Sequence, residues 1–157
     1  MKMSAGDIAR YPKFYNYVKN DIPKLIRVNQ IVAAIKKFSG TTGLVTIKQG
    51  LVWGSNPVIE VVPTLLCGGV RAYGCYPVWG DNKIQIDGGL VRAYEAGTDK
   101  RPTKAGSLVH VTGVTLLHEL THWADAKDGV DDPVPGDPLN EEGNAFELEI
   151  YGKIITL

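Results

Sequence analysis

SLVHVTGVTLLHELTHWADAK, residues 107–127, contains no proline, and Gly129 follows it closely. The segment predicts one long helix that ends at this glycine, because glycine adopts the backbone conformations that terminate helices. Between Val111 and Ala124 the only charged side chain is Glu119, if histidine is taken as neutral. Exposed helices carry charged or amide side chains between their apolar residues. The segment is therefore expected to form a largely buried helix.

His118, Glu119 and His122 lie on this helix in the pattern H-E-x-x-H. Residues four apart are one helical turn apart, so both imidazoles point the same way and can bind one zinc ion. Glu119 lies about 100° around the helix from His118, where its carboxylate can act as general base toward a metal-activated water. One alternative is a surface helix with two solvated histidines, which the uncharged flanks disfavour. Another is a site that binds metal without turnover.

A catalytic zinc site needs a third protein ligand, and a glutamate on the next helix is the commonest partner of H-E-x-x-H. NEEGNAFE, residues 140–147, supplies candidates. Glu142 is preferred, because its Glu-x-x-Ala setting resembles the peptidases with a glutamate ligand, the gluzincins. The alternatives, in order, are Glu147, Glu141 and Asp128. A simpler interpretation is that Glu141 and Glu142 only complement the positive end of a helix dipole, and Gly143 would let another backbone approach closely.

Other polar side chains carry weaker predictions. Asp125 either orients a ligand histidine or is a solvated acid near the helix end. His110 precedes His118 by two helical turns, about 12 Å along the axis, so it is expected to pack or to cap the helix. Tyr151 and Tyr94 are candidate donors to a developing oxyanion, and the alternative for both is a place in the core.

The rest of the chain predicts helices on either side of a small sheet. Phe14, Val18 and Ile22 share one helical stripe, and a second helix is expected over residues 23–38. Short β-rich runs between glycines then predict a mostly antiparallel sheet, with strands at 44–47, 57–62, 70–73 and 83–86. A short helix at 90–95, a loop at 97–105 and a final helix from Asn140 complete an α+β fold. The last strand, 83–86, is expected to bind an extended substrate by edge pairing.

Length and composition restrict the classes of protein. The 157 residues fit one domain spanning 1–157. Seventeen basic and 17 acidic residues leave no net charge, and the absence of a dense Lys/Arg cluster argues against nucleic acid as a partner. The start of the chain lacks the apolar core of a secretory signal, and charges interrupt every stretch that could span a bilayer, so a soluble chain is expected.

Two further segments have open interpretations. Cys67 and Cys75 would face each other across a glycine-rich hairpin, which makes a disulfide feasible, and two free thiols are the alternative. The acidic stretch at 125–137 lacks the regular ligand alternation of an EF-hand loop, so it is expected to be a solvated lid beside a cleft.

Several segments taken together resemble a bacterial metallopeptidase toxin family. They are YP at 11–12, LVWG at 51–54, KIQI at 83–86, HELTHWAD at 118–125, EG at 142–143, FE at 146–147 and YG at 151–152. The most specific are H-E-x-x-H and Glu-Gly-x-x-Phe-Glu. Members of the family include the C-terminal peptidase domains of some type VI secretion spike proteins. The expected fold is zincin-like, with N-terminal helices, an active-site helix and a C-terminal helix that bears the glutamate ligand.

The resemblance implies a zinc-dependent peptidase toxin that acts on protein or peptide substrates. It also implies synthesis in the bacterial cytoplasm, secretion by a carrier of the secretion apparatus, and a cognate immunity protein. Delivery would be into a rival bacterium or a host cell, with the periplasm as one destination. Because this chain lacks a delivery domain, it is expected to be a separate cargo effector or an excised domain. The alternatives are an amidase acting on cell-wall peptide and a zinc-stabilised binding module without catalysis.

Overall fold

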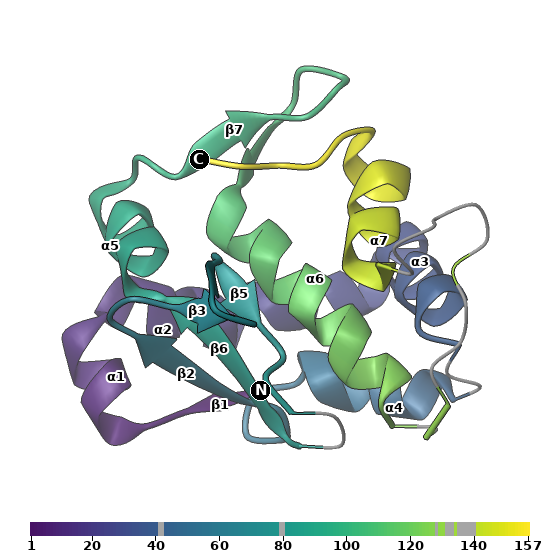
Figure 1. The fold of residues 1–157 in the computed structure, drawn as a ribbon, viewed down its shortest axis with the longest axis horizontal. Coiled ribbons are helices and arrows are strands. Elements are labelled where there is room, and N and C mark those ends of the chain that lie inside the picture. The colour runs from purple at the N-terminus through teal and green to yellow at the C-terminus, as the bar shows by residue number, and fades with distance from the viewer. Residues whose placement is uncertain (41–42, 79–80, 128, 131–133, 135–140) are drawn as a thin grey trace.

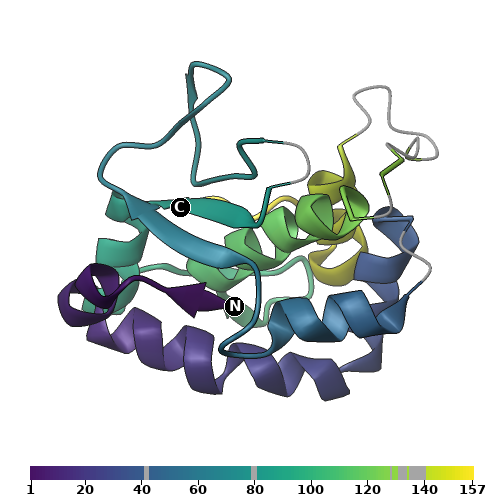
Figure 2. The same ribbon diagram turned by 90° about the horizontal axis from the view of Figure 1, so that it is seen from below.

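The N-terminal part of the protein is helical. The computed structural model describes residues 1–40, 43–78, 81–127, 129–130, 134 and 141–157. Its first elements are β1 (Lys2–Met3), α1 (Ala5–Arg10), α2 (Pro12–Asn20), the 3-10 helix η1 (Ile22–Arg27), α3 (Asn29–Phe38) and α4 (Leu44–Leu51). Phe14, Val18 and Ile22 are fully buried, as the predicted stripe requires. Figure 2 shows α2 and α4 together on one side of the sheet.

Two predictions for this part of the chain are wrong. The single helix expected over 23–38 is divided at Val28, whose extended backbone (φ −92°, ψ 91°) separates η1 from α3. Residues 44–47, expected to be a strand, form the first half of α4. The buried residues of α4 recur at helical spacing, so burial of this stripe outweighs the β preference of the short run Val-Thr-Ile.

The largest sheet has the strand order β1-β2-β6-β5 (Figure 1). Its strands other than β1 are β2 (Val58–Val62), β6 (Lys83–Asp87) and β5 (Gly74–Cys75), and two hairpins pair β3 (Leu66–Cys67) with β4 (Val70–Arg71) and β7 (Lys100–Pro102) with β8 (Leu108–His110). Three of the five pairings in the described part of the chain are antiparallel, in agreement with the predicted α+β class. The pairings β1–β2 and β2–β6 are parallel. Strand β6 lies between β2 and β5, so the edge role expected for residues 83–86 is wrong and β5 is the edge strand.

Three helices complete the fold, namely α5 (Gly88–Ala96), α6 (Val111–Asp125) and α7 (Glu142–Tyr151). Helix α6 crosses the centre of the molecule, with β5 and β6 on one side and α7 on the other (Figure 1). It begins at Val111 rather than Ser107, because residues 108–110 form strand β8. This strand pairs with β7, which lies inside the segment 97–105 that was expected to be a loop. Thirteen of its 15 residues are buried, which confirms the predicted burial. The two exceptions are His118 and His122.

One cluster of buried hydrophobic side chains joins the helices to the sheet. Cys67 and Cys75 form a disulfide, which ties the β3–β4 hairpin to β5. Among the described helices, none has both the length and the hydropathy needed to cross a membrane. The lid expected at 125–137 and the helix start expected at Asn140 lie largely outside the described residues.

Candidate metal centre

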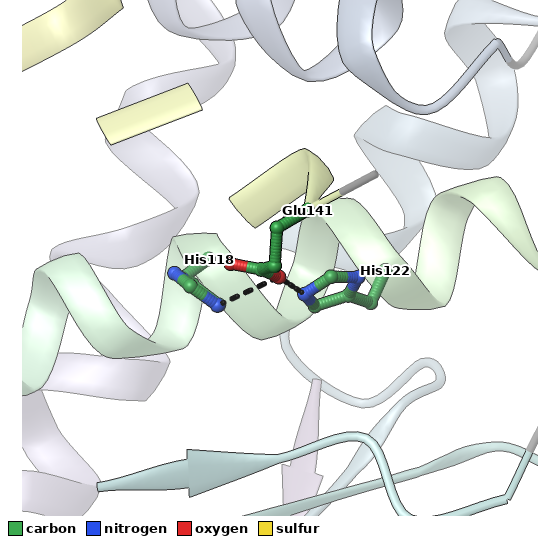
Figure 3. Close-up of side chains that lie close together, drawn as sticks. All are labelled: His118, His122 and Glu141. Atoms are coloured by element: carbon green, nitrogen blue, oxygen red, sulfur yellow. Dashed lines mark ion pairs between the residues drawn. The ribbon is translucent and has the colours of Figure 1, made fainter. Parts of the chain in front are cut away.

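His118 and His122 present their rings on the face of α6 that meets α7. Their side chains are 18% and 22% exposed, in a helix that is otherwise buried. The ring centroids are 5.1 Å apart, as expected for residues one turn apart. Both Nε2 atoms face the start of α7 (Figure 3).

Glu141 lies between the two rings and α7. Its Oε1 is 2.5 Å from Nε2 of His122 and 3.5 Å from Nε2 of His118 (Figure 3). Its Oε2 accepts a hydrogen bond of 3.1 Å from the backbone N–H of Asn144, so Glu141 is the N-cap of α7. One carboxylate oxygen therefore stabilises the helix end, as the simpler interpretation of this residue predicted, and the other faces the histidines.

The facing atoms of His118, His122 and Glu141 fit a metal ion. They lie within 4.8 Å of one another, and in the described part of the chain they are the one such group of His, Cys, Asp or Glu side chains. Nitrogen and oxygen ligands of zinc lie about 2.0–2.1 Å from the ion, which places tetrahedral ligands about 3.3 Å apart. The two observed separations, 2.5 and 3.5 Å, bracket this value. Two imidazoles with one carboxylate are a donor set typical of catalytic zinc sites.

Two further glutamates of α7 hold the other nitrogens of the rings. Oε1 of Glu147 is 2.8 Å from Nδ1 of His118, and Oε2 of Glu142 is 2.9 Å from Nδ1 of His122. Each carboxylate accepts a hydrogen bond from the Nδ1–H, so in the neutral ring the lone pair is on Nε2. Both glutamates are only 4% exposed. Each histidine is thus fixed in the orientation and tautomer that metal binding requires.

Glu119 contacts the edge strand β5 and lines a cavity with Asn144 and Glu147 of α7. It is 6% exposed, and the backbone N–H of Tyr76 donates a hydrogen bond to its carboxylate. The Gly74 backbone packs so tightly against it that an added Cβ would lie 2.6 Å from Cγ of Glu119. Burial raises the pKa of Glu119, and the nearby histidines and the Tyr76 N–H oppose that rise. A carboxylate with a raised pKa is suited to accept and release a proton near neutral pH.

The electrostatics of the cluster favour a cation. Burial alone would lower the pKa of each histidine, but hydrogen bonds to carboxylates raise it, to about 10 for His118 and about 9 for His122. The same contacts hold the pKa of Glu141 well below its usual range, although burial opposes this. Within the described residues no lysine or arginine forms an ion pair with Glu119, Glu142 or Glu147. Positive charge at the Nε2 atoms would balance these buried carboxylates.

A cavity of about 190 Å³ opens beside Glu119 and His118. Residues 72–74 of the edge segment line one wall, and residues 154–156 after α7 line another. Its size suits one amino-acid side chain, and its position places a bound chain next to both functional groups.

Several residues singled out in the sequence lie elsewhere. Tyr151 packs against Phe146 and lines a separate cavity together with His110 and Tyr17, away from the metal cluster. The ring of Tyr94 packs at a tilt of 58° against His110, whose Nδ1 is 2.7 Å from a carboxylate oxygen of Asp99, so His110 is a packing residue. Asp125 is buried rather than solvated. Asp128 lies outside the described residues.

Part of the site was not predicted from the sequence. Nothing in it indicated that the backbone of Gly74 and Tyr76 would contact Glu119, since this contact depends on how β5 pairs with β6. The one available signal was for Glu141, which lies at the start of the final helix, two residues before its close-approach glycine, Gly143. A residue at this position has its side chain directed back over the first turn.

A protein-family model described as metallopeptidase toxin 3 matches residues 7–152. The chain belongs to the metallopeptidase toxin 3 family. The predicted resemblance to a metallopeptidase toxin family is thereby confirmed. Neither the curated proteins nor the solved structures compared with the chain gave a match.

Membership of the metallopeptidase toxin 3 family gives the metal cluster its context. The matched residues include all of α6 and α7 and the edge strand β5. A metallopeptidase requires a metal ion, and His118, His122 and Glu141 form a group that could hold one. The chain is therefore a member of a peptidase toxin family, and a His-His-Glu group where α6 meets the start of α7 could hold the metal ion.

Proposed function

We propose that the chain is a zinc-dependent peptidase in which His118, His122 and Glu141 are the metal ligands and Glu119 is the general base. One observation carries the proposal: both Nε2 atoms converge on a single carboxylate oxygen, while both Nδ1 atoms are held by other carboxylates. Glu142, the ligand favoured by the sequence pattern, faces Nδ1 of His122 instead. We assign Glu142 and Glu147 the role of orienting the ligand histidines.

Zinc is the ion that best suits these donors. Calcium and magnesium prefer oxygen ligands, whereas two imidazole nitrogens favour zinc and other transition metals. When bound, a zinc ion supplies a Lewis acid that polarises a carbonyl and makes a water more acidic near neutral pH.

The protein's own groups supply proton transfer and positioning. Glu119 takes a proton from the attacking water, because its buried carboxylate lies next to the cavity and has a raised pKa. It then donates this proton to the nitrogen of the leaving amine, so the peptide bond is replaced by a carboxylate and an amine. The Tyr76 N–H holds Glu119 in place between these two transfers.

The decisive test compares glutamate-to-glutamine variants of the purified protein, after removal of metal and titration with Zn²⁺. Glu119→Gln should bind zinc normally and lose about 10²–10⁴-fold in kcat on a denatured protein substrate. Glu141→Gln should lose zinc affinity by more than Glu142→Gln or Glu147→Gln, for which about tenfold to a hundredfold is expected. Full activity of Glu119→Gln would rule out Glu119 as the general base, and zinc binding by a wild type without peptidase activity would leave only a zinc-stabilised binding module. If Glu142→Gln weakens zinc binding more than Glu141→Gln does, the ligand assignment is wrong.

We also propose that the toxin is a secreted type VI effector with a cognate immunity protein and a carrier in the secretion apparatus. The family membership and the resemblance to peptidase domains of secretion spikes support this. Expression should be toxic in the target compartment for the wild type but not for Glu119→Gln. Incubation with denatured protein and, separately, with peptidoglycan distinguishes a peptidase from a cell-wall amidase.

A further inference from the structure

Strand β5 provides part of the environment of the general base. Gly74 contacts both Glu119 and Thr115, where an added Cβ would lie 2.6 Å from each side chain. Two residues later, the backbone N–H of Tyr76 donates to the Glu119 carboxylate. The position of Glu119 therefore depends on where the three residues from Gly74 to Tyr76 lie.

Strand β5 has few hydrogen bonds of its own to hold it there. Among the described residues it pairs with β6 through two residues, Gly74 opposite Ile86 and Cys75 opposite Gln85, and the N–H of Asp87 donates a 2.8 Å hydrogen bond to the C=O of Tyr73 just before it. It is the edge strand of the sheet, so no strand of the described residues pairs with its other side in that sheet. Two-residue pairings at an edge are among the weaker parts of a sheet.

A covalent bond adds a further restraint. Cys75, the middle residue of this three-residue segment, is 4% exposed and bonded to Cys67 on the β3–β4 hairpin. The hairpin is fixed in turn at Asp87, whose Oδ2 accepts a 3.0 Å hydrogen bond from the N–H of Leu65 and lies 3.6 Å from Arg71. The restraint on β5 thus runs from Asp87 through the hairpin and the disulfide.

We propose that the Cys67–Cys75 disulfide positions Glu119 through β5 and makes the peptidase active only in its oxidised form, an inference that rests on the proposed function. Reduction is a thiol–disulfide exchange with a dithiol: two electrons pass to the bridge, Cys67 and Cys75 become thiols, and the dithiol becomes a disulfide. Cys67 is half-buried, so a reductant reaches it before the buried Cys75.

The metal ligands lie outside this chain of contacts. His118, His122 and Glu141 are held by α6 and α7 and by the carboxylates of α7. Reduction should therefore leave zinc bound and disturb the proton-transfer group alone. A displacement of about 1 Å in a catalytic group costs on the order of 10²-fold in rate. Such an enzyme would be idle in a reducing cytoplasm, where it is made, and active after export to an oxidising compartment.

The experiment compares the oxidised zinc-loaded protein with the same protein after reduction by a trialkylphosphine, which is oxidised to its oxide with oxygen from water. A phosphine is chosen because dithiols bind zinc. The variant Cys67→Ser/Cys75→Ser removes the bridge permanently. Val70→Ser is the matched control, since Val70 lies on the same hairpin and is 70% exposed. For each protein we would measure kcat, KM, zinc affinity and amide hydrogen exchange at Gly74 and Tyr76.

Reduction and the double serine variant are expected to lower kcat by tenfold or more, with zinc affinity changed by less than about threefold. Amide hydrogen exchange at Gly74 and Tyr76 should accelerate while the amides of α6 stay protected. Reoxidation should restore the activity of the reduced wild type but not that of the double variant. Equal activity of reduced and oxidised protein would overturn the proposal. The proposal would also be overturned if activity were lost only when zinc binding and the protection of α6 were lost as well. The bridge would then merely stabilise the fold. If the proposed function itself is wrong, the result differs from both of these outcomes, because the oxidised wild type and Glu119→Gln would then have the same activity.

Discussion

Gly143→Ala should damage the metal site more than its size suggests. Gly143 lies in the first turn of α7, where its backbone faces the ring of His118. An added Cβ would lie 2.3 Å from Cδ2 and 2.4 Å from Nε2 of that ring. Ordinary carbon contacts are about 3.5 Å, so the ring or the helix must retreat by about 1 Å. A shift of this size separates Nδ1 of His118 from Glu147, now 2.8 Å away, and moves Nε2 away from Glu141.

The magnitude follows from two effects of opposite sign. Alanine in place of glycine within a helix normally stabilises by about 0.5–1 kcal/mol. Overpacking a buried contact costs about 1–3 kcal/mol. The zinc-free variant should therefore lose on the order of 1–2 kcal/mol of unfolding free energy. Its zinc affinity should fall by about tenfold to a hundredfold, as it does when the groups that orient a metal ligand are lost.

Competition with a chromogenic chelator gives the zinc affinity, and urea unfolding of the zinc-free protein gives the stability. The matched control is Gly6→Ala in α1, where an added Cβ meets only the Ser4 hydroxyl at 3.8 Å. The control should keep wild-type zinc affinity and stay as stable or become slightly more stable. If Gly143→Ala binds zinc within about threefold of the wild type, the close contact between α7 and His118 does not hold the site, and the reasoning is refuted.

Three other outcomes are expected. Gly74→Ala places a Cβ 2.6 Å from Glu119, so kcat should fall by tenfold or more while zinc affinity is kept, and equal losses of both would contradict this. Removal of zinc by a chelator should lower the melting temperature by roughly 10 °C when the zinc was present at about 1,000 times its Kd, because binding then contributes about 4 kcal/mol; an unchanged melting temperature would mean that no folded-state site exists. Burial raises the pKa of Tyr94 to about 12 and also raises the pKa of Tyr17 above the usual value of about 10. The folded state favours the neutral tyrosines, so their contribution to stability is complete below pH 10 and is lost as the pH rises toward 12. Tyrosinate absorbance should then rise in step with unfolding, and titration of all tyrosines in a still-folded protein would contradict the assignment.

Much of the site was predictable because it depends on local helix geometry. The spacing of His118 and His122 places both rings on one face of any helix, and the uncharged flanks predict burial. The α+β class also followed from local patterns of apolar residues and glycines. These inferences need no knowledge of how distant parts of the chain meet.

The predictions and the structure differ where tertiary packing decides between similar local patterns. Glu141 and Glu142 are neighbours, and which of them faces Nε2 depends on the angle at which α7 meets α6. The strand expected at 44–47 is helical because its apolar stripe is buried in the core. The edge position of β5, and with it the contact of β5 with Glu119, follows from strand order, which no local pattern specifies.

The three glutamates of α7 connect the stability of the fold with its chemistry. Helix α7 can dock on α6 only by burying Glu142 and Glu147, each 4% exposed, and buried carboxylates are costly unless they accept hydrogen bonds. The Nδ1–H groups of His122 and His118 provide those bonds at 2.9 and 2.8 Å. The same bonds keep a proton on each Nδ1, so Nε2 is the nitrogen that faces Glu141 and the one that a metal ion would bind after displacing the Nε2 proton. Packing of α7 and preorganisation of the ligands are therefore one requirement, so a change that loosens α7 should weaken metal binding even when it touches no ligand.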